Sequence, residues 1–314
     1  MILDKKLVNQ FINVTSAAAV ACSKYVGKND KIIADKAATE AMRKNLNNLN
    51  IDGKVVIGEG ELDEAPMLYI GEKLGLGTGQ SLDIAVDPLE GTNFAAKNLP
   101  GALSVIAIAS KNNLFHAPET YMNKLAVGYD VPKDAIDIDF SIEKNIANIA
   151  DSKNKDISKI TACILDRPRH KEIIKKLKEL NVNIKLITDG DVSGALLVTD
   201  NKYEVDIFLG IGGGPEGVLA ECALDAFNCH FKGRSTFESD SDKKRAKEMG
   251  IDDLTKKYNL SEIVRGDSIF CATGITDSDL VSGVRIKGNT IATETFVTHK
   301  KANFKKIIKT EFNT

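Results

Sequence analysis

Apolar residues recur along the chain with two different spacings. In the segments 4–25 and 34–49 they return every three or four positions, which is typical of helices that bury one face. Elsewhere stand short β-branched runs, such as residues 82–87 and 103–109, which indicate buried strands. Because the two patterns alternate, the sequence predicts an α/β or α+β architecture.

Further elements follow the same alternation. A strand at 55–57 precedes a helix at 65–74. The other predicted strands cover 160–165, 184–187, 205–211 and 269–273, and the other predicted helices cover 169–180, 192–199 and 216–226. The polar segment 129–156, which holds Pro132 and many charges, predicts a boundary between two closely packed domains, 1–155 and 156–314.

Composition places the chain among ordinary globular proteins. Of its 314 residues, 43% are hydrophobic and 27% are charged, and these values exclude a disordered or low-complexity chain. The 42 Lys and Arg residues nearly balance the 44 Asp and Glu residues, so the formal charge is -2. We therefore expect no general attraction to nucleic acid or anionic membranes, and an anionic ligand would need a local site.

The first residues and the cysteines both predict a soluble, cytoplasmic protein. Charged and amide side chains interrupt the N-terminal apolar pattern, so it does not resemble a secretory signal, and no apolar stretch approaches the ~18 residues of a membrane span. The five cysteines are odd in number and lack CxxC spacing, which predicts small buried residues rather than disulfides or a zinc site. The short lysine-rich tail predicts a solvated surface.

A first acidic cluster follows the predicted strand 55–57. Glu59, Glu61, Asp63 and Glu64 stand within six residues, among glycines, where an ordinary turn needs only one or two acids. Crowded carboxylates repel one another unless solvent or a cation relieves the repulsion. Helix capping before Pro66 is the alternative interpretation, and it suits Glu64 and Asp63 better than Glu59 and Glu61.

A second cluster, Asp87-Pro88-Leu89-Glu90-Gly91-Thr92, ends the predicted strand 82–87. The carboxyl ends of strands are where α/β sheets hold ligands, and a turn at Pro88 would let Asp87 and Glu90 converge. Backbone N–H groups near Gly91 and Thr92 would open the next helix and could hold a phosphate. A plain β-turn remains the alternative.

The third feature is the glycine-rich string Gly212-Gly213-Gly214-Pro215-Glu216 between a predicted strand and a predicted helix. It contains neither GxGxxG nor GxxxxGK[ST], which excludes a dinucleotide or nucleoside-triphosphate loop. Glu216 could serve only as a partner of the helix dipole. Together with Asp35, Glu59, Asp87 and Glu90, however, it could complete a two-metal cluster for phosphoryl transfer, and an all-oxygen site admits both Mn²⁺ and Mg²⁺.

At these residues the sequence resembles a known family. Asp87 to Thr92 is similar to the metal-binding signature of the lithium-sensitive, inositol-monophosphatase-like phosphatase superfamily. Within this superfamily, the sequence specifically resembles the class II fructose-1,6-bisphosphatases. The resemblance is carried by VVIGEGELDEAPMLYIGEKLG, DIAVDPLEGTNFAAKN and several shorter strings, which follow in collinear order from about residue 4 to residue 297. The resemblance implies a layered α/β/α/β/α sandwich, with metal and phosphate bound by the N-terminal domain and substrate by the C-terminal domain.

The same resemblance implies hydrolysis of the 1-phosphate of fructose 1,6-bisphosphate, a step of gluconeogenesis, with Mn²⁺ or Mg²⁺ as cofactor. A homo-oligomer is expected as well, on general grounds rather than from any residue or motif. The resemblance assigns the metal to Asp35, Glu59, Asp87, Glu90 and Glu216. It assigns the substrate to Glu90, Gly91, Thr92, Tyr121, Arg167, Pro168, Arg169, Asp189, Gly190, Asp191 and Gly213. We expect Thr92 to position the attacking water or to attack directly, with Glu61 or Asp63 taking the proton.

Several alternatives stay open. Arg167 and Arg169 suit a phosphate that is not cleaved, yet they could be surface charges. Asp191 could be a helix N-cap, and Tyr121 a core aromatic. Arg167 stands where the family has Lys. Sedoheptulose 1,7-bisphosphate could be the substrate as well or instead. Two further interpretations are that the protein is an inositol or nucleotide phosphatase, or that it is a non-catalytic sugar-phosphate sensor.

Overall fold

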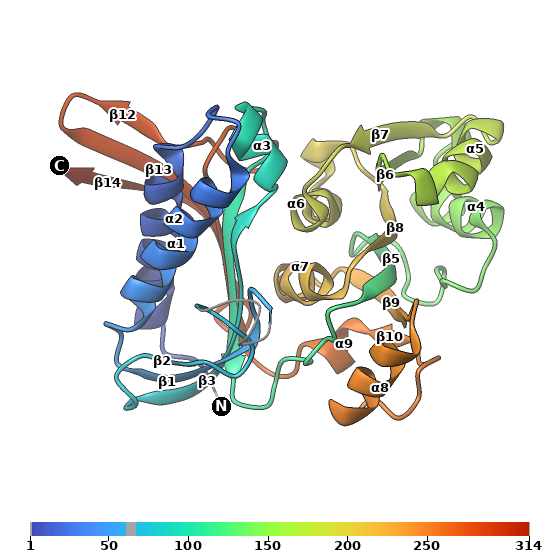
Figure 1. The fold of residues 1–314 in the computed structure, drawn as a ribbon. Helices are drawn as coiled ribbons and strands as arrows, with labels where there is room; N and C mark the ends of the chain where they lie inside the picture. The colour runs from blue at the N-terminus through green and yellow to red at the C-terminus, as the bar shows by residue number, and fades with distance from the viewer. Residues whose placement is uncertain (1, 61–66, 314) are drawn as a thin grey trace. The chain divides into compact units, whose positions relative to one another are not determined.

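The computed structural model describes residues 2–60 and 67–313. The chain divides into two compact units, one formed by Met1–Phe115 and Val264–Thr314 and the other by His116–Ile263 (Figure 1). This division differs from the boundary at residue 155 that the sequence predicts. The reason is strand pairing, because β11 (Ser268–Gly274) returns to pair antiparallel with β4 (Leu103–Ser110) in the first unit.

Among the described residues, the first unit holds an eight-stranded sheet in the order β12-β13-β11-β4-β3-β1-β2, with β14 paired to β13. β1 and β3 run parallel, while the other neighbours are antiparallel. The remaining elements of this unit are α1 (Lys6–Ser23), α2 (Lys31–Leu46), β1 (Ile51–Ile57), β2 (Lys73–Leu74), β3 (Gln80–Glu90), α3 (Thr92–Lys97), β12 (Arg285–Lys287), β13 (Thr290–His299) and β14 (Phe304–Asn313).

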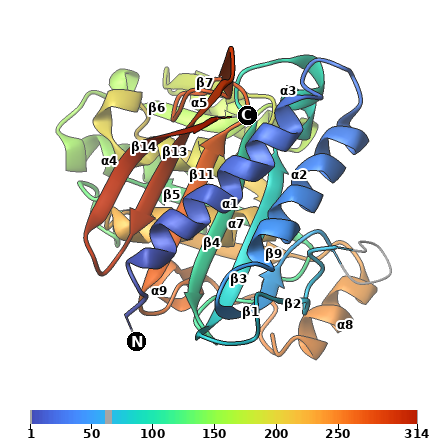
Figure 2. The same cartoon turned by 90° about the vertical axis from the view of Figure 1, so that its left-hand side faces the viewer.

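Helices α1 and α2 lie side by side across one face of this sheet (Figure 2). Their apolar stripes, with Phe11 and Met42 fully buried, pack on strand residues such as Ile84 and Ile106 to form one core. The Asp30 side chain begins α2 by accepting a hydrogen bond from the Ile33 N–H at 3.1 Å. The helices predicted at 4–25 and 34–49 are confirmed.

The second unit has, among the described residues, a six-stranded sheet in the order β10-β9-β5-β8-β6-β7. Its α6 and α7 lie on one face of the sheet, and α4 and α5 on the other (Figure 1). The elements are β5 (Tyr121–Val127), α4 (Ile142–Lys153), β6 (Thr161–Leu165), α5 (Lys171–Glu179), β7 (Asn183–Ile187), α6 (Asp191–Leu196), β8 (Ile207–Gly213), α7 (Gly214–Ala226), β9 (His230–Thr236), α8 (Asp240–Glu248), β10 (Tyr258–Asn259) and α9 (Leu260–Ile263). Short 3₁₀ turns, including Pro168–His170, join some of them.

The α/β class is confirmed, but some predicted elements differ. The helix predicted at 65–74 is wrong in its described part, because Leu68 and Gly71 have φ values of 55° and 97° and β2 follows at Lys73. The polar segment 129–156 contains helix α4. The basic tail forms strand β14, whose Lys306 and Lys309 are exposed, as the predicted solvated surface requires. All five cysteines are buried, as predicted. Within the described ranges, no helix combines the length and the apolar character needed to cross a membrane.

Candidate active site

The first acidic segment begins where β1 ends. The Glu59 N–H donates to the Leu68 carbonyl at 3.0 Å, which folds the chain back over the strand. A side chain at Gly58 could not be accommodated, since its Cβ would lie 1.9 Å from the Leu68 oxygen. The Glu59 side chain is half-buried. Glu61 and Asp63, the residues predicted to take a proton, lie outside the described residues.

At the second segment the strand does not end at Asp87 as predicted. β3 continues through Pro88 to Glu90 and carries a bulge, because Asp87 pairs with Val105 but Glu90 pairs with Leu103. The Asp87 carboxylate accepts a hydrogen bond from the Leu89 N–H at 3.1 Å. Asp87 is half-buried and Glu90 is buried. The bulge therefore re-aims the chain at the two acidic residues.

Gly91 and Thr92 form the beginning of α3, as the sequence predicts. Gly91 is the N-cap and adopts a left-handed conformation with φ 78°. A side chain there would be strained and would also place its Cβ 2.8 Å from the Phe94 ring. Thr92 is the first residue of the helix, is half-buried and stands two positions after Glu90 in the chain.

Asp35 lies in the second turn of α2 and is half-buried. Burial raises the pKa of its carboxyl group. The first unit thus carries Asp35, Glu59, Asp87 and Glu90, four of the five predicted metal ligands. Over the described residues the structure shows no preassembled group of three or more His, Cys, Asp or Glu side chains that could hold a metal ion.

The fifth predicted ligand, Glu216, lies in the first turn of α7 in the second unit. Within the described residues its Oε2 is buried without a hydrogen-bond partner. Burial raises the pKa of Glu216, and the nearby Lys124 ammonium opposes this shift. The carboxylate lies over Gly213, where a Cβ would come within 1.8 Å of Oε2. The glycines at 212 and 213 belong to β8 rather than to a loop, which corrects the strand end predicted at residue 211.

The predicted substrate residues of the second unit gather at one edge of its sheet. Arg167, Asp189 and Gly213 stand at the carboxyl ends of β6, β7 and β8, which is the edge where α/β sheets hold ligands. Tyr121 begins the antiparallel strand β5 and pairs with Gly213, so it lies at the same edge.

The two arginines at this edge are anchored rather than freely solvated. Arg167 Nη1 donates to the Thr188 carbonyl at 2.5 Å, and its Nη2 lies 3.6 Å from Asp189 Oδ1. Arg169 Nε donates to the Ile211 carbonyl at 2.8 Å, and its guanidinium lies 4.6 Å from the centre of the Tyr121 ring. Tyr121 is 40% exposed, which rules out the core-aromatic interpretation. Pro168 begins the 3₁₀ turn between the arginines.

Asp191 is not the N-cap of the helix that follows it. Gly190, with φ 83°, takes the N-cap position, and Asp191 is the first residue of α6. The Asp191 carboxylate instead receives a hydrogen bond from Lys124 Nζ and lies against Gly212, where a Cβ would be 2.0 Å from Oδ2. Asp191 Oδ1 has no hydrogen-bond partner in the part of the chain that the structure describes.

Lys124 and His170 were missed by the sequence reasoning. Both are buried, and both contact the sheet edge that carries the substrate residues. Lys124 could have been noticed only if strand β5 had been recognised, since a lysine between Met122 and Ala126 breaks its apolar pattern. His170 stands next to Arg169 in the sequence, and nothing in its neighbours marks it.

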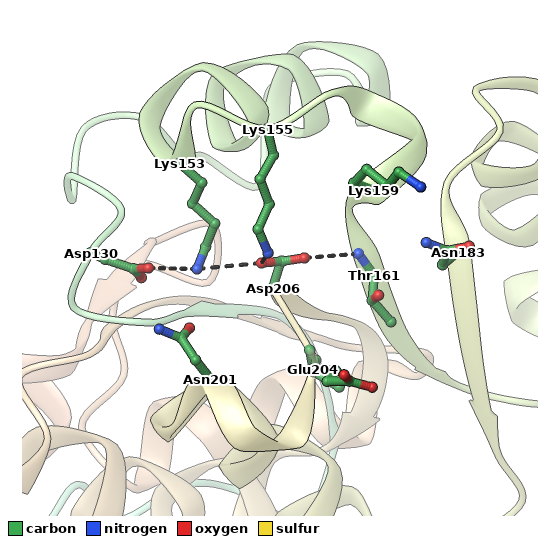
Figure 3. A pocket seen from close by; sticks show the side chains of 10 residues that line it. Asp130, Lys153, Lys155, Lys159, Thr161, Asn183, Asn201, Glu204 and Asp206 are labelled. Atoms are coloured by element: carbon green, nitrogen blue, oxygen red, sulfur yellow. Dashed lines mark hydrogen bonds and ion pairs between the residues drawn. The ribbon is translucent and has the colours of Figure 1, made fainter.

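A separate pocket of about 670 Å³ lies at the opposite end of these strands, beside the starts of β6 and β8 (Figure 3). Lys153 Nζ lies 2.6 Å from an Asp130 oxygen and 3.3 Å from an Asp206 oxygen. Asp206 also receives Lys155 Nζ at 2.7 Å and the Thr161 N–H at 2.9 Å. Three lysines and three carboxylates line the pocket, so their charges balance: Lys153, Lys155, Lys159, Asp130, Glu204 and Asp206. This pocket therefore offers no net positive charge to a sugar bisphosphate.

Comparison with known proteins decides the family. The sequence matches the family model described as bacterial fructose-1,6-bisphosphatase, glpX-encoded, over residues 5–312. The chain belongs to this family. The resemblance seen in the sequence is thereby confirmed, and the protein is an enzyme of this group of phosphatases.

Two relatives show how far the family likeness extends. Fructose-1,6-bisphosphatase 1 class 2 of Escherichia coli (strain K12) is 42% identical over 314 residues, which cover 96% of this chain and 93% of the relative. A protein of Synechococcus sp. (strain JA-2-3B'a(2-13)), named D-fructose 1,6-bisphosphatase class 2/sedoheptulose 1,7-bisphosphatase, is 41% identical over 94% of this chain and 92% of the relative. Among solved structures, an inositol monophosphatase from Anabaena (Nostoc) sp. PCC 7120 matches 61% of this chain and 69% of its own, with 14% identity and a TM-score of 0.31.

Proposed function

We propose that this bacterial-type fructose-1,6-bisphosphatase hydrolyses the 1-phosphate of D-fructose 1,6-bisphosphate to fructose 6-phosphate and inorganic phosphate, as gluconeogenesis requires. The observation that carries the proposal is the edge of the second sheet, where Arg167 and Arg169 stand beside Asp189 and Asp191. Guanidinium groups bind phosphate through charge-assisted hydrogen bonds, whereas carboxylates accept hydrogen bonds from sugar hydroxyls. This combination suits a sugar that keeps one phosphate after the other is removed.

We infer that divalent cations, Mn²⁺ or Mg²⁺, are held by Asp35, Glu59, Asp87, Glu90 and Glu216. The donor set fits, because hard divalent cations prefer carboxylate oxygens. The buried Glu216 Oε2, which has no hydrogen-bond partner within the described ranges, also favours a ligand at that atom. When bound, such cations neutralise phosphate charge and lower the pKa of a water molecule.

The chain's own groups then position the reacting atoms. Thr92, at the start of α3, either orients the attacking water or attacks the phosphorus itself. Either Glu61 or Asp63 takes the proton that is released. The backbone at Gly91 and the Glu90 carboxylate hold the scissile end of the substrate, since both residues immediately precede Thr92 at the start of α3.

We infer that the second unit binds the end of the substrate that is not cleaved. Arg167 and Arg169, joined by Pro168, hold the 6-phosphate, and the Tyr121 hydroxyl donates a hydrogen bond to the same ligand. Asp189 and Asp191 accept hydrogen bonds from sugar hydroxyls, and the backbone at Gly190 and Gly213 contacts the same ligand. At Arg167, where the resemblance led us to expect a lysine, the guanidinium is a planar, forked donor.

Sedoheptulose 1,7-bisphosphate is the second candidate substrate. The Synechococcus relative, 41% identical, carries both activities in its name. The two sugars present the same pair of terminal phosphates, so the same arginines serve both. A cytoplasmic location and a homo-oligomeric state, both predicted from the sequence, remain predictions.

Phosphate release tests the proposal. The purified protein is incubated with fructose 1,6-bisphosphate, sedoheptulose 1,7-bisphosphate, inositol 1-phosphate and a nucleoside monophosphate, each with Mn²⁺, with Mg²⁺ and with a chelator. We expect metal-dependent release from the bisphosphates and far less from the monophosphates. Release from the monophosphates at equal rates would contradict the bisphosphate assignment, and tight binding without release would favour a sensor. Glu90→Gln should abolish release in every case.

A further inference from the structure

Lys124 is a buried lysine that no part of the proposed reaction uses. It lies in the middle of β5 and is 2% exposed. Its ammonium donates to the Gly213 carbonyl at 2.7 Å and to Asp191 Oδ2. A buried ammonium is costly unless it is paired, so its retention calls for a physical reason.

The two acceptors belong to different segments of the chain. Asp191 is the first residue of α6, and Gly213 ends β8 and precedes α7. Lys124 reaches both from a third segment, because β5 pairs with β8 and places Lys124 opposite Gly210. One ammonium therefore ties α6 and the end of β8 to β5.

Small residues make room for this arrangement. At Gly217 a Cβ would lie 3.3 Å from Lys124 Cδ, and at Gly212 it would lie 2.0 Å from Asp191 Oδ2. The stem of the lysine and the carboxylate thus occupy space that side chains would otherwise fill. The close approach of Asp191 to β8 depends on this space.

The hydrogen bond from Lys124 engages only one of the two carboxylate oxygens of Asp191. Oδ2 is held by the lysine, while Oδ1 is buried and has no hydrogen-bond partner in the described part of the chain. A buried carboxylate oxygen without a partner favours a ligand donor, such as a sugar hydroxyl. Fixing one oxygen orients the other, which reduces the conformational freedom lost when substrate binds.

We propose that Lys124 is a positioning residue for substrate recognition: it orients the Asp191 carboxylate towards a sugar hydroxyl and fixes the Gly213 backbone beside it. The inference rests on the proposed function, because it takes the ligand to be the sugar bisphosphate. Lys124 itself does not touch the substrate. Its effect reaches binding through Asp191 and Gly213.

Lys124→Met tests the proposal, with Lys153→Met as the matched control. Lys153 is also a buried lysine of the second unit paired with aspartates, but it lies at the opposite pocket shown in Figure 3. KM and kcat for fructose 1,6-bisphosphate and the unfolding midpoint are measured for both variants. We expect Lys124→Met to raise KM about tenfold or more, while Lys153→Met lowers the unfolding midpoint with KM changed less than about twofold.

Lys124→Gln guards against a variant that does not fold, because the amide can still donate to the Gly213 carbonyl. We expect it to raise KM by less than Lys124→Met and by more than Lys153→Met. The positioning role is wrong if the Lys124 variants that fold have the same KM as the Lys153→Met control. This holds whether both Lys124 variants fold or only Lys124→Gln does. If the wild type releases no phosphate at all, the proposed function fails and the inference falls with it.

Discussion

His170 Nε2 accepts a hydrogen bond from the backbone N–H of Ile211 at 2.8 Å. The second ring nitrogen, Nδ1, lies 2.7 Å from the Leu165 carbonyl, so it must carry the proton and donate it. The imidazole is therefore neutral, and it joins Leu165 at the end of β6 to Ile211 of β8. Burial of the ring lowers the pKa of His170.

This pKa shift predicts a loss of stability in acid. Because the pKa is lower in the folded state than its ordinary value of 6.5, the unfolded chain binds the proton more readily. The contribution of His170 is therefore complete above pH 6.5 and declines as the pH falls below it. His170→Gln should cost about 1–2 kcal/mol at pH 8, for the lost bond to Leu165, and less at pH 5. Denaturant unfolding at several pH values measures this, and a pH-independent difference would contradict it.

Glu221 predicts the opposite dependence. Its side chain is fully buried in α7, and both carboxylate oxygens are without hydrogen-bond partners among the residues described. Burial raises the pKa of Glu221 well above its ordinary value of 4.5, although Lys124 opposes the shift. The folded state then binds the proton more readily, so stability falls as the pH rises above 4.5.

Glu221→Gln removes this titration with little change in shape. We expect the variant to be more stable than the wild type by on the order of 1–3 kcal/mol at pH 8, with the difference nearly gone at pH 4.5. Urea unfolding of both proteins across this range measures the effect. A variant that is less stable than the wild type at pH 8 would show that the ionised carboxylate stabilises the fold.

Arg169 provides a test of which phosphate the second unit holds. Arg169→Gln should raise KM for fructose 1,6-bisphosphate about 10- to 100-fold, because a charge-assisted hydrogen bond contributes about 1.5–3 kcal/mol. With fructose 1-phosphate, which lacks the distal phosphate, the same change should have little effect. Arg285→Gln, at an exposed arginine of β12, is the control. Equal losses with both sugars would contradict the assignment.

Substitutions at Thr92 should separate the effect on substrate binding from the effect on the chemical step. Thr92→Ala should reduce kcat by about 10²–10⁴ while substrate affinity, measured by calorimetry, is retained. Thr92→Ser, which keeps a hydroxyl, should recover most of the rate. Turnover equal to wild type in the alanine variant would remove Thr92 from the mechanism.

The sequence was informative where one local rule decides the structure. The spacing of apolar residues predicted α1 and α2, and the glycine before Thr92 marked the start of α3. Short motifs also named the acidic residues at the ends of β1 and β3. In these places neighbours in the chain are sufficient to determine the conformation.

The predictions that were wrong or missing concern segments whose structure depends on partners far away in the chain. β5 was missed because its only signal is a seven-residue strand containing Lys124, and that lysine is explained by partners 67 and 89 residues away. The unit boundary was displaced because β11 pairs with β4 across more than 150 residues of chain, which local composition does not record. The helix predicted at 65–74 is wrong in its described part. There Glu72 accepts a hydrogen bond from Arg43 Nε at 2.5 Å and does not continue a helical face.

The proposed reaction requires that Asp35, Glu59, Asp87, Glu90 and Glu216 share bound divalent cations. Anomalous diffraction at the manganese edge, from crystals grown with Mn²⁺ and fructose 6-phosphate, measures this directly. We predict manganese peaks about 2.0–2.6 Å from oxygens of these carboxylates, the range that hard divalent cations take in proteins. Manganese bound elsewhere, with Glu59, Asp87 and Glu216 contacting none of it, would contradict this assignment of the metal ligands.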